Sequence, residues 1–385
     1  MGAAMSGEVH KEASGTDWAA WPTRSPEDAF TLGVEEELML LSPGGWNLAQ
    51  AADEVLPRLP EAIRSRVCPE THAAALEIET GVARTVADAT RELRGLRDGL
   101  RETVEPLDLA VASSGTHPFA VWRETALGGG ERQAEVYGSM RELARREPTY
   151  ALHVHVGMPD QDAAVAVFNR MRVHLPLLLA LSGNSPFWQG RDTGLASART
   201  PLFQAFPRVG IPRRFDDYAE WVGAVDMLVA CDAFPDSSYL WWDVRMVPRH
   251  GTLEVRIMDA QIDLDATASL VALTQCLARM ELEEAWAEEA SHAPQEVWEE
   301  NRFVAARDGI DARLIVVTEG VRVPVADRVD ELLPRLRPHA QDLGCADELE
   351  GILDLVRENG AKRQLEIARD EDRLPGLVQA LAGAY

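Results

Sequence analysis

The chain has 385 residues, of which 46% are hydrophobic and 26% charged, a composition typical of a globular protein. This length allows one large domain or two ordinary ones, with a substantial core. The formal net charge of −25, from 38 basic and 63 acidic side chains, argues against nucleic acid or an anionic membrane as the main partner, because both bind clustered Lys and Arg.

The cysteines and the apolar segments bear on the cellular compartment. Four cysteines lie far apart, at positions 68, 231, 276 and 345, which is neither a zinc framework nor a disulfide scaffold. The longest strongly apolar run, around residues 175–181, is too short to cross a bilayer. The sequence has no basic segment followed by an apolar stretch, so it does not predict a signal peptide. We therefore expect a cytoplasmic protein without a membrane or nucleic-acid partner.

The N-terminal segment differs from the rest of the chain. Residues 1–26 mix Ala, Gly, Ser and Thr with charged residues, so they are predicted to form a flexible leader. No internal repeat or linker divides the remainder of the chain. We expect residues 27–385 to form a single domain.

Strands and a helix are predicted in the first part of this domain. From Phe30 to Leu40 the residues alternate, with Leu32, Val34, Glu36, Leu38 and Leu40 on one face and Glu35, Glu37 and Met39 on the other. A second strand is expected at 74–80. A helix over 86–107 and a short strand at 109–114 come next.

The middle of the chain continues this pattern. A third long strand is predicted at 150–157, followed by a helix from Asp162, its expected N-cap, to Ser182. Residues 183–212 are rich in Gly, Pro, Ser and Arg, and are predicted to be an extended loop. Two more strands are expected at 240–247 and 252–259, and the remainder from Asp265 is predicted to be mostly helical.

Four of the predicted strands share one unusual feature. Each has two ionisable side chains, two residues apart, on one face, and an aliphatic opposite face. The pairs are Glu35/Glu37, Glu77/Glu79, His153/His155 and Glu254/Arg256. One such pair alone is explained by the wet face of an antiparallel sheet. Several together raise one another's pKa and destabilise the fold unless positive charge compensates.

Bound divalent cations would supply that charge. Mg²⁺ takes hard oxygen ligands and commonly bridges protein carboxylates to substrate phosphates. Arg256, beside Glu254, would add a positive group for a phosphate or carboxylate. The common nucleotide-binding loops are absent from the sequence, so any ATP would bind through metals on a sheet.

An ordered series of motifs resembles the carboxylate–amine ligase family, also called glutamate–cysteine ligase type 2. The resemblance extends from about residue 28 to 370. Its motifs are FTLGVEEEL (30–38), SGTHPF (114–119), HVHVG (153–157), GNSPFWQGRDTG (183–194), WWDVR (241–245), GTLEVR (251–256) and ENR (300–302).

The resemblance implies an α+β, glutamine-synthetase-like fold, in which a curved, mostly antiparallel sheet forms a funnel flanked by helices. It implies a catalytic domain that uses ATP and Mg²⁺, with Mn²⁺ as an alternative ion, to form an acyl phosphate that an amine attacks. The acid would be glutamate and the amine cysteine or another amino compound. A homodimer is one expected assembly.

The resemblance also implies roles for individual residues. The implied metal ligands are Glu35, Glu37, Glu77, His153 and Glu254. Arg256, together with Glu254, would act at the transferring phosphate. The candidates for substrate binding are His155, Arg191, Arg199 and Glu70.

The sequence departs from the family pattern where the substrate would bind. Tyr150, Ala151 and Leu152 stand where the family usually has cysteines, and Leu195 and Ala198 where it usually has tyrosines. Three alternatives stay open: a ligase for a different acid or amine in a specialised pathway, a non-catalytic binding protein of the same fold, and a metal-dependent hydrolase that acts without ATP.

Overall fold

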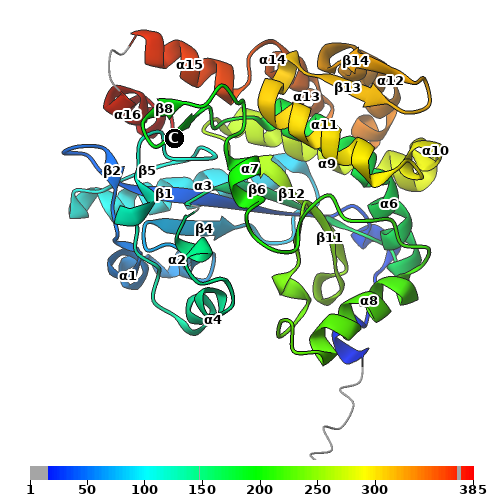
Figure 1. The fold of residues 1–385 in the computed structure, drawn as a ribbon, viewed down its shortest axis with the longest axis horizontal. Coiled ribbons are helices and arrows are strands. Elements are labelled where there is room, and N and C mark those ends of the chain that lie inside the picture. The colour runs from blue at the N-terminus through cyan, green and yellow to red at the C-terminus, as the bar shows by residue number, and fades with distance from the viewer. Residues whose placement is uncertain (1–15, 147, 371–373) are drawn as a thin grey trace, which may run out of the picture.

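A central antiparallel sheet organises the chain, and the computed structural model describes residues 16–146, 148–370 and 374–385. Six strands are hydrogen-bonded in the order β11-β12-β6-β1-β4-β3, and the short strands β2 and β5 also pair with β1 (Figure 1). Every pairing in this sheet is antiparallel. The strands are β1 Leu32–Ser42, β2 Asn47–Leu48, β3 Val67–Pro69, β4 Ala75–Glu79, β5 Ala110–Ala112, β6 Ala151–Gly157, β11 Val244–Val247 and β12 Thr252–Asp259.

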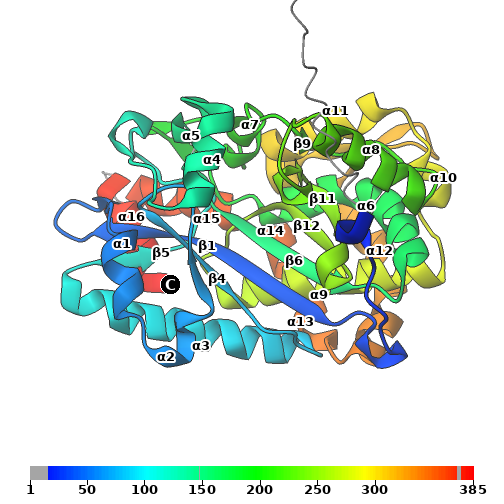
Figure 2. The same cartoon turned by 90° about the horizontal axis from the view of Figure 1, so that it is seen from below.

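One face of the sheet is aliphatic and is covered by three long helices (Figure 2). Leu32, Val34 and Leu38 of β1 are at most 1% exposed and share a core with Leu93 of the first of these helices. The second helix is long and apolar enough to cross a membrane, but 83% of its apolar window is buried inside the protein, as in a core helix. The three helices are α3 Val86–Val104, α6 Gln161–Ser182 and α9 Leu264–Glu283.

Further elements surround this core. The helices are α1 Ala52–Val55, α2 Glu61–Arg64, α4 Glu131–Met140, α5 Leu143–Arg146, α7 Arg199–Phe203, α8 Tyr218–Ala230, α10 Glu288–Ser291, α11 Gln295–Asp308, α12 Val325–Leu343, α13 Ala346–Glu350, α14 Ile352–Arg357, α15 Gly360–Asp370 and α16 Leu374–Ala384. Three two-stranded sheets pair β7 Phe187–Trp188 with β8 Arg191–Asp192, β9 Val209–Gly210 with β10 Trp241–Trp242, and β13 Arg313–Val316 with β14 Val321–Pro324.

The other face of the sheet is polar at one end and apolar at the other. Met39 and Leu41, which come after Glu35 and Glu37 on this face of β1, are fully buried in a second core. Leu377 and Leu381 of α16 belong to the same core. The C-terminal helix therefore closes one end of the face that presents the ionisable pairs.

Most predicted elements are present, with three differences. The single strand predicted at 240–247 is divided into β10, which pairs with β9, and β11, which pairs with β12 in the central sheet. Helix α6 is capped by Asp160, whose Oδ1 accepts from the backbone N–H of Ala163 at 2.8 Å, so Asp162 is not the N-cap. The segment 183–212 is not a featureless loop, because it contains β7, β8, α7 and β9. These pieces are two to five residues long, too short to produce a periodic pattern.

The leader predicted at residues 1–26 is described only in part, since residues 1–15 lie outside the described chain. From Trp18 onward the chain differs from a loose leader. Trp18 Nε1 donates to Asp226 Oδ1 at 2.7 Å, and the Tyr218 hydroxyl donates to the Ala19 carbonyl at 2.7 Å. Figures 1 and 2 show this blue segment beside α8.

Candidate active site

The ionisable pairs meet in one row across adjacent strands. Strand register sets Glu35 of β1 opposite both Glu79 of β4 and His153 of β6. Glu37 lies opposite Glu77, and His155 opposite Glu254 of β12. Directly opposed residues in an antiparallel sheet have Cβ atoms about 5 Å apart. The structure therefore brings the predicted carboxylates and histidines together.

Two groups of side chains have the geometry of a metal site. One is Glu35, His153 and Glu254, and the other is Glu37, Glu77 and His153; within each group the ligand atoms lie within 4.8 Å of one another. His153 belongs to both groups. Its Nδ1 is 3.0 Å from Glu35 Oε2 and 3.6 Å from Glu77 Oε1, and its Nε2 is 3.7 Å from Glu37 Oε1.

The carboxylates around β4 are only partly compensated by positive charge, because Arg199 and Arg256 lower the pKa of Glu37 less than other effects raise it. Burial and, after it, the nearby Glu70 carboxylate raise the pKa of Glu37 to about 8. Burial and then Glu35 raise the pKa of Glu77 well above its ordinary value. A divalent cation bound among these oxygens would favour their ionised forms and so oppose both shifts. The donor set, rich in carboxylate oxygens, fits Mg²⁺ or Mn²⁺.

At the β12 end of the row, positive groups do surround the carboxylates. Burial opposes ionisation of Glu254, but Arg245 and Arg256 outweigh it and lower its pKa. Both guanidinium groups form ion pairs with Glu254, which is fully buried. Burial likewise opposes ionisation of Glu35, but His155 and hydrogen bonds to His153 and His155 hold its pKa well below the ordinary value.

The pKa values of the two histidines shift in opposite directions. Burial and then Arg256 lower the pKa of His153 to about 4, so its imidazole is neutral near pH 7, the form that binds a metal. For His155, burial is outweighed by Glu254 and Glu35, which raise its pKa. His155 Nε2 lies 3.1 Å from Glu35 Oε1, and its Nδ1 lies 2.9 Å from the Thr252 hydroxyl.

The candidates for substrate binding have different surroundings. Arg199 is 6% exposed, donates to the carbonyls of Ile257 and Arg256 at 3.1 Å each, and lies 3.9 Å from Asp259. Its Nε is buried without a hydrogen-bond partner in the described chain. Glu70 is close enough to Glu37 to raise its pKa, although less than burial does. Arg191, by contrast, is exposed on β8 and is not among the residues brought together here.

Arg245 was not singled out as a site residue from the sequence. It lies in a predicted strand and is paired in register with Glu254, on the same face of the sheet. Its Nη1 also donates to the carbonyl of Ser238 at 3.0 Å. Strand alternation indicated its face, but only the pairing of β11 with β12 brings it to Glu254.

Other conspicuous residues have structural surroundings. His117 Nε2 lies 2.8 Å from the Trp46 carbonyl, and its Nδ1 accepts hydrogen bonds from the backbone N–H groups of Phe119 and Ala120. Trp241 and Trp242 lie in aromatic contacts. Arg213 pairs with Glu220 at the surface, at 2.7 Å. These contacts explain the side chains without a role in chemistry.

Two cavities are relevant to ligands. One, of about 280 Å³, lies beside Glu35 and His155 and is also lined by Arg66, His250 and Thr252. We call it the mouth cavity.

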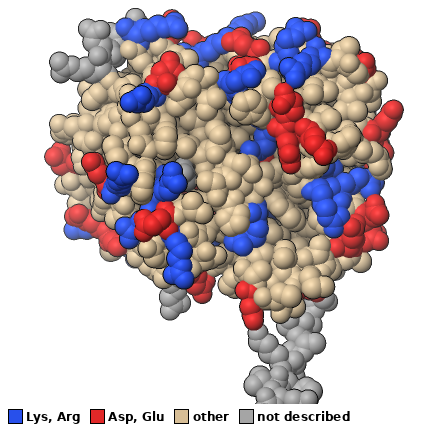
Figure 3. All heavy atoms as spheres, viewed as in Figure 1, with Lys and Arg blue, Asp and Glu red and all other residues tan. Residues whose placement is uncertain are grey.

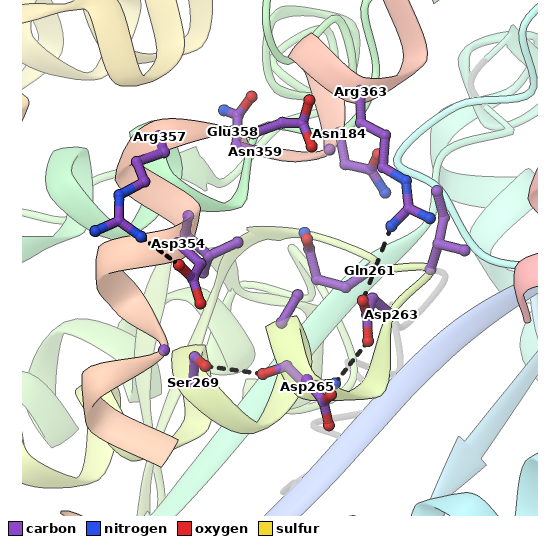
Figure 4. Close-up of a pocket in the computed structure, with 15 residues that line it drawn as sticks. Asn184, Gln261, Asp263, Asp265, Ser269, Asp354, Arg357, Glu358, Asn359 and Arg363 are labelled. Atoms are coloured by element: carbon purple, nitrogen blue, oxygen red, sulfur yellow. Dashed lines mark hydrogen bonds and ion pairs between the residues drawn. The ribbon is translucent and has the colours of Figure 1, made fainter. Parts of the chain in front are cut away.

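The other cavity, of about 420 Å³, lies between the start of α9 and helices α14 and α15 (Figure 4). Four of the charged groups that line it form two pairs: Arg357 with Asp354 at 2.7 Å, and Arg363 with Asp263 at 3.8 Å. None of the predicted metal ligands lines it.

Comparison with proteins of known sequence identifies relatives along almost the whole chain. A protein of Rubrobacter xylanophilus with the provisional name glutamate–cysteine ligase 2-1 is 42% identical over 341 residues, 88% of this chain and 90% of that protein. A second protein from the same organism, provisionally named glutamate–cysteine ligase 2-3, is 39% identical over 360 residues, 92% of this chain and 97% of its own.

Solved structures share the fold. The crystal structure of glutamate–cysteine ligase from Francisella tularensis in complex with AMP has a TM-score of 0.68 at 13% identity, covering 92% of this chain and 88% of that one. The bifunctional glutathione synthetase of Pasteurella multocida also scores 0.68, at 15% identity, over 93% of this chain and 51% of that one. The α+β fold predicted from the resemblance is confirmed.

The sequence family is equally clear. The model of glutamate–cysteine ligase family 2 matches residues 31–379, which include all four pairs of ionisable residues. The predicted family is therefore confirmed, and the chain belongs to glutamate–cysteine ligase family 2, a family of ATP-dependent carboxylate–amine ligases.

Proposed function

We propose that this ligase uses ATP and Mg²⁺ to convert a carboxylic acid, glutamate or a close analogue, into an acyl phosphate, and then couples it to an amine. The observation that carries the proposal is the row of carboxylates and histidines across β4, β1, β6 and β12, with Arg256 at its end. A carboxylate is a poor acylating agent because its leaving group would be oxide. Transfer of a phosphoryl group supplies a better leaving group.

Phosphoryl transfer depends mainly on positioning and on neutralising charge. Residues Glu35, Glu37, Glu77, His153 and Glu254 would hold the metal ions, which supply charge neutralisation at the phosphates. Glu254 is already ionised and buried between two guanidinium groups. Arg256 has no hydrogen-bond acceptor other than Glu254 among the described contacts of its side chain. It is therefore the group we assign to the transferring phosphoryl.

Arg199 is the candidate for holding the acid. Its guanidinium is fixed by two backbone carbonyls of β12, and its Nε has no partner in the described chain. An arginine with a fixed orientation and a free donor is suited to a carboxylate. Glu70, beside the row, and His155, within it, would bound the space for the two substrates.

The identity of the acid and the amine depends on the residues at the apolar end of the row. Tyr150 is fully buried, its hydroxyl has no partner in the described chain, and burial followed by Glu37 raises its pKa. This tyrosine stands where the family usually has cysteine, so the space next to Glu37 has a different shape. That difference supports the second candidate function, a ligase for another acid or amine.

The test is a mass-spectrometric screen of acid and amine pools with ATP and Mg²⁺, with ADP release measured in parallel. We expect one acid to support ADP release and one amine to yield a condensed product. Binding of Mg-ATP without ADP release for any pair of substrates would instead favour a non-catalytic binding protein. Turnover without ATP would favour a hydrolase.

Two variants control for the assignment of the site. Glu35→Gln and Glu254→Gln should abolish turnover while circular dichroism remains that of the native protein. Loss of one preorganised charged group typically costs on the order of 10²–10³ in kcat. ADP production close to that of the unmodified protein by either variant would contradict the site.

A further inference from the structure

A short N-terminal segment, residues 18–28, is fastened across the end of the sheet; we call it the strap. It precedes the region 31–379 that the family model matches. Trp18 packs edge-on against Trp221 of α8, with ring centroids 5.4 Å apart, and donates its indole N–H to Asp226. Ala19 is 7% exposed and accepts a hydrogen bond from Tyr218. Side-chain and backbone contacts therefore hold the strap to α8.

Two glycines let the strap approach the strands of the active site. Gly251, with φ +61°, immediately precedes β12, and a Cβ there would lie 2.6 Å from Arg24 Nε and 2.7 Å from Pro22 Cγ. Gly157 ends β6, and a Cβ there would lie 2.7 Å from the Asp28 carbonyl and 2.9 Å from Arg24 Nη1. Both strands bear site residues. The strap is thus packed directly on the strands that carry His155 and Glu254.

Arg24 is the strap residue that lines the mouth cavity. Its Nη2 donates to the carbonyl of His250, and its Nη1 donates to the Asp28 carbonyl at 3.2 Å and to the Thr31 hydroxyl at 3.3 Å. All three acceptors are neutral oxygens. Its Nε is buried without a hydrogen-bond partner in the described chain.

The mouth cavity connects Arg24 to the row of metal-ligand candidates. Glu35, His155 and Thr252 line the same cavity, and a second guanidinium, Arg66, faces it. The His250 ring lies edge-on to His155, with centroids 6.2 Å apart. A polyanion whose one end is held through metal ions at Glu35 and Glu254 could extend past these groups toward Arg24.

We propose that the strap forms a wall of the nucleotide-binding cavity, and that Arg24 contacts the phosphates of the nucleoside triphosphate on the side away from the metal ions. This inference rests on the proposed function. It assigns to a segment outside the family match a role in nucleotide affinity. The strap would act on nucleotide binding without acting on the acid.

The test compares Arg24→Ala and Arg24→Lys with Arg58→Ala, which removes an exposed arginine paired with Glu54. Binding of MgADP is measured by calorimetry, and KM for ATP and for the acid by kinetics. A hydrogen bond to a charged group is worth about 1.5–3 kcal/mol, or about 10- to 100-fold in affinity. We expect Arg24→Ala to weaken MgADP binding and raise KM for ATP by that factor, with KM for the acid unchanged and Arg24→Lys intermediate.

Other outcomes overturn the inference. If Arg24→Ala bound MgADP with the affinity of the unmodified protein, or raised KM equally for ATP and for the acid, Arg24 would not contact the nucleotide as proposed. Inorganic phosphate that binds as tightly as MgADP and loses affinity equally in the variant would indicate a simple anion site. If the unmodified protein neither binds MgADP nor hydrolyses ATP, the proposed function fails as well.

A second measurement does not depend on the variants. Trypsin cleaves after arginine, and the peptide bond that comes after Arg24 lies in the strap. MgADP should slow cleavage at this bond in the unmodified protein, whereas the acid alone should not. Equal cleavage with and without MgADP would contradict the strap as a wall of the cavity.

Discussion

Glu35, Glu36 and Glu37 are adjacent in the chain but have opposite surroundings, because successive residues of a strand face opposite sides of the sheet. Glu35 and Glu37 face the row of ionisable groups. Glu36 is fully buried on the aliphatic side, where Arg97 of α3 donates to both of its oxygens at 2.8 and 2.9 Å. The Thr267 hydroxyl of α9 donates to it as well.

This difference predicts that the same substitution lowers stability at one position and turnover at its neighbour. Glu36→Gln leaves Arg97 buried without a counter-charge, so the free energy of unfolding should fall by about 3–5 kcal/mol. Glu37→Gln removes a candidate metal ligand, so turnover should fall on the order of 10²–10³ while the fold is retained. Urea denaturation and ADP release measure the two effects. A Glu37→Gln enzyme with native turnover would contradict the assignment.

Arg245 and Arg256 share Glu254 but differ in their other contacts. Arg245 also donates to the carbonyls of Ser238 and Leu240, at 3.0 and 3.4 Å, whereas the described hydrogen bond and ion pair of the Arg256 side chain are with Glu254 alone. Arg245 is therefore held in place, and Arg256 is free to contact a phosphate when a metal ion takes over Glu254.

The two arginine variants should consequently show a crossed pattern. Arg245→Ala should lower the free energy of unfolding by about 1–3 kcal/mol, more than Arg256→Ala does. Arg256→Ala should lower kcat on the order of 10²–10³, more than Arg245→Ala does. Thermal unfolding and steady-state kinetics on both variants measure this. The same ratio of stability loss to kcat loss in both would refute the division of roles.

At the scale of elements, the long strands could be predicted because each has one face with ionisable side chains and one aliphatic face. Alternation located β1, β4, β6 and β12 and oriented Glu35, His153 and Glu254 correctly. It could not supply register, because pairing of β6 with β1 and with β12 joins segments about 95 to 125 residues apart. The resemblance to a family supplied the expectation that these strands converge.

The segment from Gly183 to Arg199 could not be predicted in this way, because tertiary contacts hold it. Asp259 of β12, fully buried, accepts hydrogen bonds from the Asn184 backbone N–H and from the hydroxyls of Ser185 and Ser197, at 2.6–2.9 Å. The Ser185 hydroxyl in turn accepts from the Arg199 N–H at 3.2 Å. One carboxylate thus fastens the segment that orients Arg199.

Asp259→Ala should therefore loosen this segment and misplace Arg199. Leaving several buried donors unsatisfied should cost about 3 kcal/mol or more in the free energy of unfolding, and KM for the acid should rise more than KM for ATP. Asp265→Ala, which changes an exposed aspartate at the start of α9, is the matched control. Equal increases in both KM values would indicate general disruption instead.

At the scale of the molecule, the acidic side chains behind the net charge of −25 lie partly on the surface and partly in the row on the sheet. On the face in Figure 3, basic and acidic side chains lie interspersed rather than in one continuous basic area. The carboxylates of the row are instead crowded on the polar part of the sheet face whose apolar end is closed by α16. Assembly and cellular compartment remain predictions from the sequence.

This crowding couples stability to pH, and the pKa of Glu37 determines the sign. Its ordinary value is 4.5, and burial followed by Glu70 raises it to about 8. Below pH 4.5 both folded and unfolded chains hold the proton, so Glu37 causes no dependence of stability on pH there. Between these values only the folded chain holds it, and stability falls by up to about 1.4 kcal/mol per pH unit as pH rises. The raised pKa of His155 acts in the same direction above pH 6.5.

We therefore expect the metal-free protein to lose thermal stability between pH 6.5 and 8, and Mg²⁺ to restore more stability at pH 8 than at pH 6.5. His153, with a pKa of about 4 in the folded chain, opposes the trend only near pH 6.5, where the unfolded histidine still loses its proton. Glu35 and Glu254, whose pKa values are lowered, are ionised in both states in this window. Melting temperatures in EDTA and in Mg²⁺ measure it, with Glu37→Gln as the control in which the pH dependence in EDTA should diminish. A metal-free protein that becomes more stable toward pH 8 would show that these carboxylates are not crowded as described, because a raised carboxylate pKa cannot stabilise the folded state as the proton is lost.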